Sequence, residues 1–154
     1  MGRKHTYYDE QFSRQDYDST DAGDFERGLI FVAMPFDDEM KEVYLAIKDV
    51  CSKLGFKVKR VDEGIGSGII AREITDLIER AEFIIFDLTY ERPNVYYELG
   101  YAHGVGNEPM DILLVAKEGA KIHFDINSQR IQFYKSIEHL RSLVALSLEK
   151  MRQY

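Results

Sequence analysis

The sequence predicts a single α/β domain in which helices cover both faces of a parallel β-sheet. From residue 28 onward, short apolar runs alternate with amphipathic stretches of helical length. This alternation is typical of strand–helix–strand units, in which neighbouring strands run parallel. The chain of 154 residues has room for one domain of ordinary size. We therefore expect about five strands and four or five helices.

Three continuous apolar runs predict strands that are buried on both faces of the sheet, namely LIFVAMP, which ends at Pro35, EFIIFDL and DILLVA. FKVKRVD alternates apolar and basic residues, which indicates an edge strand with one face in water. RIQFY is expected to add a short further strand. The natural order is 2-1-3-4-5, the flavodoxin-like arrangement of a three-layer sandwich. Ligands of such sheets bind beyond the carboxyl ends of the strands, so the loops after LIFVAMP, FKVKRVD and EFIIFDL should line one cleft.

Four stretches have the character of helices. Apolar residues recur at helical spacing in residues 40–54 and 70–78, and Pro93 suits the first turn of a helix over PNVYYELGYAHG. KSIEHLRSLVALSLEKMRQ is expected to close the chain as a helix. Cys51, the only cysteine, lies on the apolar stripe of the first helix, and we interpret it as a buried core thiol. One cysteine forms neither an intrachain disulfide nor a zinc–cysteine site, which favours a reducing, cytoplasmic setting.

Composition excludes several classes of partner. A net charge of -7 argues against a broad surface for nucleic acid, which needs basic side chains. No apolar run reaches the roughly 20 residues that cross a bilayer, and the first residues lack the apolar stretch of a secretory signal. The four histidines have no metal-ligand spacing, so we expect no metal and no cofactor. A cytoplasmic protein without nucleic-acid or membrane partners is the expectation.

Residues 1–27 differ from the rest of the chain. They are rich in Asp, Tyr, Gln and Ser and nearly devoid of aliphatic residues, which is typical of a flexible acidic arm. Tyr7, Tyr8 and Tyr17 could dock on a partner, and a disordered tail is the alternative interpretation. The folded domain is accordingly expected over residues 28–154.

Polar residues gather where the buried strand EFIIFDL meets the following helix. Asp87 ends the strand, at the edge of the sheet where ligands bind. Asn94 and Glu98 lie four residues apart on the predicted helix, so they share a face, and Tyr101 lies three residues further on. Two carboxylates in one cleft can cleave a glycosidic bond, one as nucleophile and the other holding sugar hydroxyls or moving protons. Asp87 as a loop cap, Asn94 as a helix-start residue and Glu98 as a surface acid are the alternatives.

The loop GIGSG precedes a predicted helix and could present backbone amides to a phosphate. The residues concerned are Gly66, Ser67 and Gly68, and Arg72 follows one turn into the helix. No Gly-Lys-Ser/Thr follows, so the loop is not a Walker motif. A plain flexible turn and a solvated arginine are the alternatives.

These residues carry a family resemblance. IFVAMPFDDEM, together with ERAEFIIFDLTYERPNVYYELGYAHG, resembles the nucleoside 2-deoxyribosyltransferase-like proteins and their bacterial TIR-like relatives. The similarity covers roughly residues 28–116, and the tail FDINSQRIQFYKSIEHLRSLV resembles the end of the TIR-like members. The resemblance implies that Glu98 is the nucleophile at the anomeric carbon and that Asp87 helps to hold the sugar. It also implies a homo-oligomer, since transferase sites are often completed by a neighbouring subunit.

The chain departs from the family in one turn. The classical transferases have an acidic, Gly-Thr-rich turn before the nucleophile, whereas this chain has Arg92-Pro93-Asn94-Val95. Asn94 is expected to orient the ribose in place of the missing acid. Backbone amides after Met34, Pro35 and Phe36 and in GIGSG are expected to hold base or phosphate, with Arg72 and Tyr101 as further contacts.

Two functions follow. The first is cleavage of an N-glycosidic bond, by hydrolysis or transfer, in a nucleoside, nucleotide or NAD-like ligand through a Glu nucleophile. The alternative is a non-catalytic nucleotide sensor or adaptor of TIR-like type in bacterial signalling or defence. A flavin or response domain is less well supported, because no Ser/Thr-rich phosphate loop follows the first strand.

Overall fold

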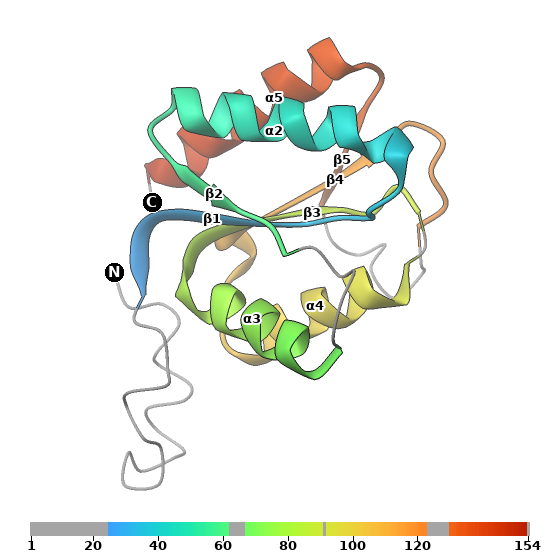
Figure 1. Ribbon diagram of the computed structural model, residues 1–154. Helices are drawn as coiled ribbons and strands as arrows, with labels where there is room; N and C mark the ends of the chain where they lie inside the picture. Colours follow the sequence, from blue (N-terminus) through green and yellow to red (C-terminus); the bar gives the residue numbers. More distant parts are fainter. Residues whose placement is uncertain (1–24, 62–66, 91, 123–129, 154) are drawn as a thin grey trace, which may run out of the picture.

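The computed structural model describes residues 25–61, 67–90, 92–122 and 130–153, with side chains left undescribed at 67–71. Within these ranges, five strands form one parallel sheet in the order β2-β1-β3-β4-β5, as the sequence predicts (Figure 1). The strands are β1 (Glu26–Ala33), β2 (Lys57–Lys59), β3 (Ala81–Asp87), β4 (Ile112–Lys117) and β5 (Ile131–Tyr134). β1 begins two residues before the predicted start of the domain, and the arm up to residue 24 lies outside the described residues.

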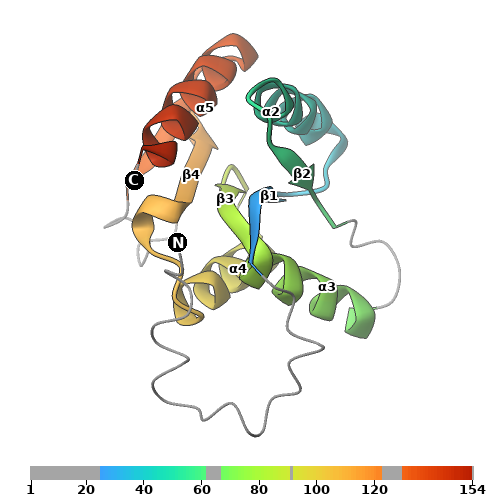
Figure 2. The same cartoon turned by 90° about the vertical axis from the view of Figure 1, so that its left-hand side faces the viewer.

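Helices cover both faces of the sheet, which gives three layers. One face carries α2 (Lys41–Lys53) and α5 (Ile137–Arg152), and the other carries α3 (Ser67–Arg80) and α4 (Pro93–Gly104) (Figure 1). Two single 3₁₀ turns, η1 (Asp38–Met40) and η2 (Pro109–Asp111), precede α2 and β4. Viewed along the sheet, β4 and α5 lie on one side of the molecule and β2 and α2 on the other (Figure 2). None of the helices in the described ranges is long and apolar enough to cross a membrane.

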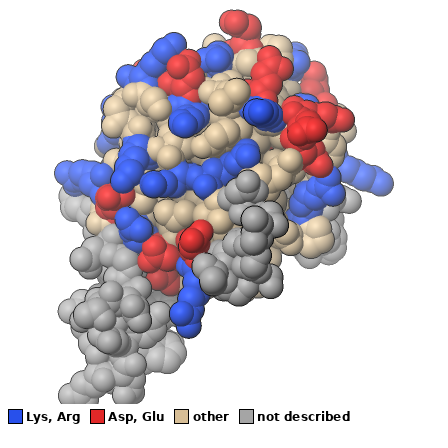
Figure 3. Space-filling model, in the orientation of Figure 1, with Lys and Arg blue, Asp and Glu red and all other residues tan. Residues whose placement is uncertain are grey.

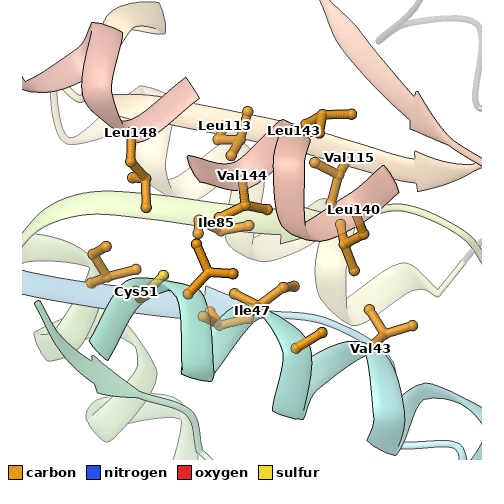
Figure 4. Close-up of a cluster of buried hydrophobic side chains, with 14 of the residues drawn as sticks. Val43, Ile47, Cys51, Ile85, Leu113, Val115, Leu140, Leu143, Val144 and Leu148 are labelled. Carbon is orange, nitrogen blue, oxygen red and sulfur yellow. The ribbon is translucent and has the colours of Figure 1, made fainter. Parts of the chain in front are cut away.

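The central strands are buried because alternate side chains enter two separate apolar clusters. In β1, Ile30 and Val32 point toward α2 and α5, whereas Leu29 and Phe31 point toward α3 and α4. Cys51 lies fully buried in the first cluster, on α2, as predicted (Figure 4). Burial of each large aliphatic or aromatic side chain contributes about 1.5–3 kcal/mol, so the two clusters fix which face of each helix meets the sheet.

β2 is the edge strand that the alternating FKVKRVD pattern predicts, although only Lys57–Lys59 pair with β1. Lys57 and Lys59 are exposed, and Figure 3 shows Lys and Arg side chains in a band across this face of the molecule. Charged side chains on an exposed strand disfavour pairing with another chain. The preceding Phe56 anchors the strand in the core by an edge-to-face contact with Phe83, at 5.9 Å between ring centroids.

One boundary differs from the prediction. Ser67 and Gly68 belong to the first turn of α3, not to the loop before it, and Gly66 lies outside the described residues. The first backbone amides of a helix have no hydrogen-bond partner within the helix. The amides of residues 67 and 68 could therefore still donate hydrogen bonds to a phosphate, as the sequence analysis expects of this loop.

Candidate functional site

The loops after β1 and β3 are tied together at the carboxyl edge of the sheet. One guanidinium nitrogen of Arg92 lies 2.9 and 2.8 Å from the two carboxylate oxygens of Asp37. The hydroxyl of Tyr90 donates a hydrogen bond to the carboxylate of Glu39. Arg92 is also the N-cap residue of α4, so the pair with Asp37 connects the start of that helix to the segment after β1.

The loop after β2 joins the same edge through an aromatic contact. The guanidinium carbon of Arg60 lies 4.3 Å from the ring centroid of Phe36 and 4.2 Å from that of Tyr44. Such stacking holds the planar cation between two ring faces. Among the described residues, the segment after β1 therefore contacts both the loop after β3 and Arg60, the first residue after β2, while residues 62–66 of the third loop lie outside the described residues.

Asp87 lies at the centre of this edge and is fully buried. Its Oδ1 accepts hydrogen bonds from the backbone amide of Thr89, at 2.8 Å, and from the Thr89 hydroxyl. Its Oδ2 accepts a hydrogen bond of 2.8 Å from the hydroxyl of Tyr134, the last residue of β5. The Thr89 hydroxyl oxygen in turn accepts a bond of 3.1 Å from the amide of Lys117, at the end of β4. Through Asp87, the ends of β3, β4 and β5 are joined in one network.

The network sets the proton affinity of its members. Burial raises the pKa of the Asp87 carboxyl above its ordinary value, while the hydrogen bonds from Thr89 and Tyr134 and the charge of Lys117 offset part of the rise. Burial and the neighbouring Asp87 carboxylate raise the pKa of the Tyr134 hydroxyl. The phenol therefore stays protonated and acts as a donor at neutral pH.

Glu98 lies in the second turn of α4 and is only 5% exposed. The same helix places Val95 and Leu99 in the apolar cluster that contains Phe86 and Leu88 at the end of β3. Glutamate is rarely buried to this degree in a folded protein unless it is paired. An acidic side chain buried near the carboxyl end of β3 is unusual for a helix that packs against a sheet, and such exceptions are often found at functional sites.

The other predicted residues of α3 and α4 are spread over a wider area. Asn94 is exposed in the first turn of α4, and Arg72 is exposed on α3. Tyr101 is half-buried, and its hydroxyl donates to Glu79, so it ties α4 to α3. The ligand contacts assigned to these residues stay predictions.

The segment after β1 contains apolar residues followed by acidic residues. Met34 and Pro35 are buried, whereas Phe36 is 36% exposed. Asp37, Asp38 and Glu39 follow directly, and two of these acids begin η1. Arg92 pairs with Asp37 and Arg60 lies against Phe36, so basic side chains offset part of this negative charge.

Sequence reasoning missed Tyr134, Thr89 and Arg92 as members of this site. Tyr134 could have been predicted from the sequence, because the last residues of parallel strands lie at the same edge of the sheet, and Asp87 and Tyr134 both end a strand. The partner of Arg92 is 55 residues away in the chain, and no sequence pattern identifies it. Within the described ranges, no three His, Cys, Asp or Glu side chains lie close enough together to hold a metal ion.

Comparisons with known proteins place the fold. No protein-family model matches the chain, and no curated protein matches it significantly. A mutant of the flavo di-iron protein of Thermotoga maritima matches with a TM-score of 0.61 and 19% identity over 84% of this chain. A flavoprotein from the same organism matches with a TM-score of 0.60 and 18% identity over 84% of this chain. The chain spans only 38% of the length of each of these two proteins.

The CMP N-glycosidase of Clostridium botulinum matches over nearly its whole length. The TM-score is 0.60 with 15% identity, and the match covers 77% of this chain and 98% of the glycosidase. At such identities the likeness concerns the fold alone. The chain has a flavodoxin-like fold, which it shares with a nucleotide-cleaving enzyme and with the flavo di-iron proteins.

Proposed function

We propose that this protein cleaves the N-glycosidic bond of a nucleoside, a nucleotide or an NAD-like compound, with Glu98 as the nucleophile. The observation that carries the proposal is the buried glutamate on α4, directly after the strand that ends in Asp87. Ligands of doubly wound sheets bind at this edge, where the segment after β1 contacts the loop after β3. The N-glycosidase that shares the fold over 98% of its length supports the same reaction class.

The reaction balances without a metal or redox group. A carboxylate oxygen of Glu98 forms a bond to the anomeric carbon while the bond from that carbon to the base nitrogen breaks. The electron pair of the broken bond leaves with the base. A nucleoside base then takes a proton, which the attacking water releases in the hydrolysis, whereas nicotinamide leaves as a neutral molecule and takes none. Water attacks the glycosyl ester and releases the sugar, or a second base attacks and completes a transfer. Bases that leave readily, such as nicotinamide, need little acid assistance.

The remaining residues have supporting roles in this proposal. Asn94, in the first turn of α4, orients the ribose, and Asp87 holds the network that supports the cleft from beneath. The exposed ring of Phe36 offers a stacking surface for the base.

The test is release of free base. Purified protein is incubated with CMP, a panel of nucleosides and NAD, and the products are separated by chromatography. We expect one class of compound to lose its base, and Glu98→Gln to abolish that release, since an amide is not a nucleophile here. Glu98→Asp keeps the charge and withdraws the carboxylate by one methylene, so it should also lose most of the activity. Glu138→Gln, which changes an exposed acid on α5, is the matched control and should leave release unchanged.

The contradictory outcomes are distinct. If a compound raises the melting temperature of the protein but no base is released from it, the result would support a nucleotide sensor and contradict an enzyme. If Glu98→Gln still releases base, the proposed reaction would stand, but Glu98 would not be its nucleophile. Yellow protein with bound flavin after purification would favour the chemistry of the flavo di-iron neighbours instead.

A further inference from the structure

An open groove of about 1070 Å³ lies away from the candidate site, between the edge strand β5, helix α5 and the turn η2. β5 is the last strand of the sheet, so its outer side has no strand neighbour among the described residues. The described lining residues that matter here are His103, Met110, Arg130, Phe133, His139, Leu146 and Lys150.

The groove gathers exposed apolar side chains. Met110 is 41% exposed, Phe133 is 42% exposed and Leu146 is 60% exposed. They come from three separate elements, η2, β5 and α5, and meet only through the fold. An exposed patch assembled in this way is typical of an interaction site.

The charge of the groove is opposite to that of the chain as a whole. Its described lining includes Arg130 and Lys150 together with His103 and His139, and contains no Asp or Glu. The whole chain carries a net charge of -7. The chemistry of the groove therefore matches an occupant that combines acidic and aromatic side chains.

We propose that this groove is the docking surface for residues 1–24 of the same chain. That segment holds six acidic and three basic residues, which gives 3 − 6 = −3. Its aromatic residues stand among the acids, as in Tyr7-Tyr8-Asp9-Glu10-Gln11-Phe12 and Asp16-Tyr17-Asp18. Aromatic rings would cover Phe133, Leu146 and Met110, while the acids would pair with Arg130 and Lys150.

The geometry of the sheet lets the segment reach the groove. The segment joins the fold at Glu26, the first residue of β1, and the turn that carries Met110 leads directly into the first residue of β4. In a parallel sheet the first residues of all strands lie at the same edge. Only β3 separates β1 from β4, a distance of about 10 Å at the usual strand spacing. About seven extended residues span more than twice that distance, which leaves the aromatic positions free to bind.

The test uses the full chain with a nitroxide spin label beside the groove. Glu149→Cys places the label on an exposed position of α5 next to Lys150, outside the lining. Cys51 is fully buried, and burial raises its pKa to about 12, so the reagent modifies the introduced thiol. We expect the amide NMR signals of residues 1–24 to lose intensity, and to regain it when the nitroxide is reduced. A label at Glu42→Cys, exposed on α2 at the opposite edge of the sheet, is the control and should leave those signals intact.

Substitutions in the groove separate docking from mere proximity. Phe133→Ser combined with Lys150→Glu should restore the signals of the segment, and added salt should restore them in part. Leu45→Ser combined with Lys48→Glu, at exposed positions of α2, is the matched control and should change nothing. Full intensity throughout the segment in the labelled protein would overturn the proposal. A mixture of isotope-labelled chains without the nitroxide and spin-labelled chains without the isotope detects contacts between chains alone. Intensity lost in that mixture would assign the groove to the segment of a second copy, and would equally overturn the proposal.

Discussion

The hydroxyl of Tyr134 donates a hydrogen bond of 2.8 Å to the buried carboxylate of Asp87 and so connects the ends of two strands that are not neighbours in the sheet. β4 lies between them, and its last residue joins through the bond from the Lys117 amide to the Thr89 hydroxyl. The carboxyl edge of the sheet is therefore held by side chains as well as by strand pairing. The ligand that we propose for this edge would bind above side chains that hydrogen bonds already hold in place.

Removal of the Tyr134 hydroxyl should destabilise the protein. In Tyr134→Phe the ring still fills its place in the core, but a buried carboxylate oxygen loses its donor. The cost of an unsatisfied buried acceptor is about 1–3 kcal/mol. Urea denaturation followed by circular dichroism measures this difference in the free energy of unfolding. Tyr97→Phe, at a side chain that is 69% exposed, should change it very little, and an equal loss in both variants would contradict the assigned role.

Ionisation of Asp87 should make the stability of the protein fall as the pH rises. The folded state raises the pKa of Asp87, so it holds the proton more firmly than the unfolded chain does. This contribution is fully present below the ordinary carboxyl pKa of about 3.9 and is lost as the pH rises through the raised value. Asp87→Asn cannot ionise. The free energy of unfolding of the native chain minus that of the variant should therefore decrease from about pH 4 upward and then level off.

Denaturation at a series of pH values and constant ionic strength gives that difference. Other carboxylates titrate in both proteins and cancel in the subtraction. A difference that stays constant across the series would show that Asp87 ionises as easily in the folded protein as in the unfolded chain, and one that increases would show that it ionises more easily in the folded protein.

Cys51 should be unreactive in the native protein. The thiol is fully buried on α2, and burial raises its pKa to about 12, so very little thiolate exists at pH 8. We expect Ellman's reagent to detect no thiol in buffer and one thiol per chain in concentrated urea. Rapid reaction in buffer would mean that the contact between α2 and the sheet opens readily.

The pair of Arg92 and Asp37 should matter more for activity than for stability. The two side chains are 51% and 37% exposed, and ion pairs of this kind contribute about 0–1 kcal/mol to the free energy of unfolding. The same pair connects the segment after β1 to the start of α4, the helix on which Glu98 lies. If the protein releases base as proposed, Arg92→Gln should lower kcat/KM. Arg92→Lys should lower kcat/KM less, since lysine keeps the positive charge but lacks the planar guanidinium.

The matched control for Arg92 is Lys53→Gln, which breaks an exposed ion pair with Asp49 on α2. It should leave kcat/KM unchanged. A loss of activity in Arg92→Gln that follows a large fall in melting temperature would show that the pair acts on the fold and not on the position of α4.

The periodicity of the apolar residues was sufficient to predict the layers of the fold. Buried parallel strands need continuous apolar runs, and helices that cover them need a stripe at every third or fourth residue, so both elements carry a strong local signal. The edge position of β2 followed from Lys57 and Lys59 for the same reason. The start of α3 was misplaced, because Ser67 and Gly68 are residues that also favour a turn.

The sequence by itself determined the strand order, the burial of Cys51 and the position of Asp87 and Glu98 beside one edge of the sheet, since these depend on local pattern and on the rules of parallel sheets. Only the tertiary structure decided that Asp87 accepts a hydrogen bond from Tyr134, that Arg92 pairs with Asp37, and that Met110, Phe133 and Leu146 share one groove. Each of these contacts joins segments that are distant in the chain. Which residues meet there depends on how whole helices and strands pack together.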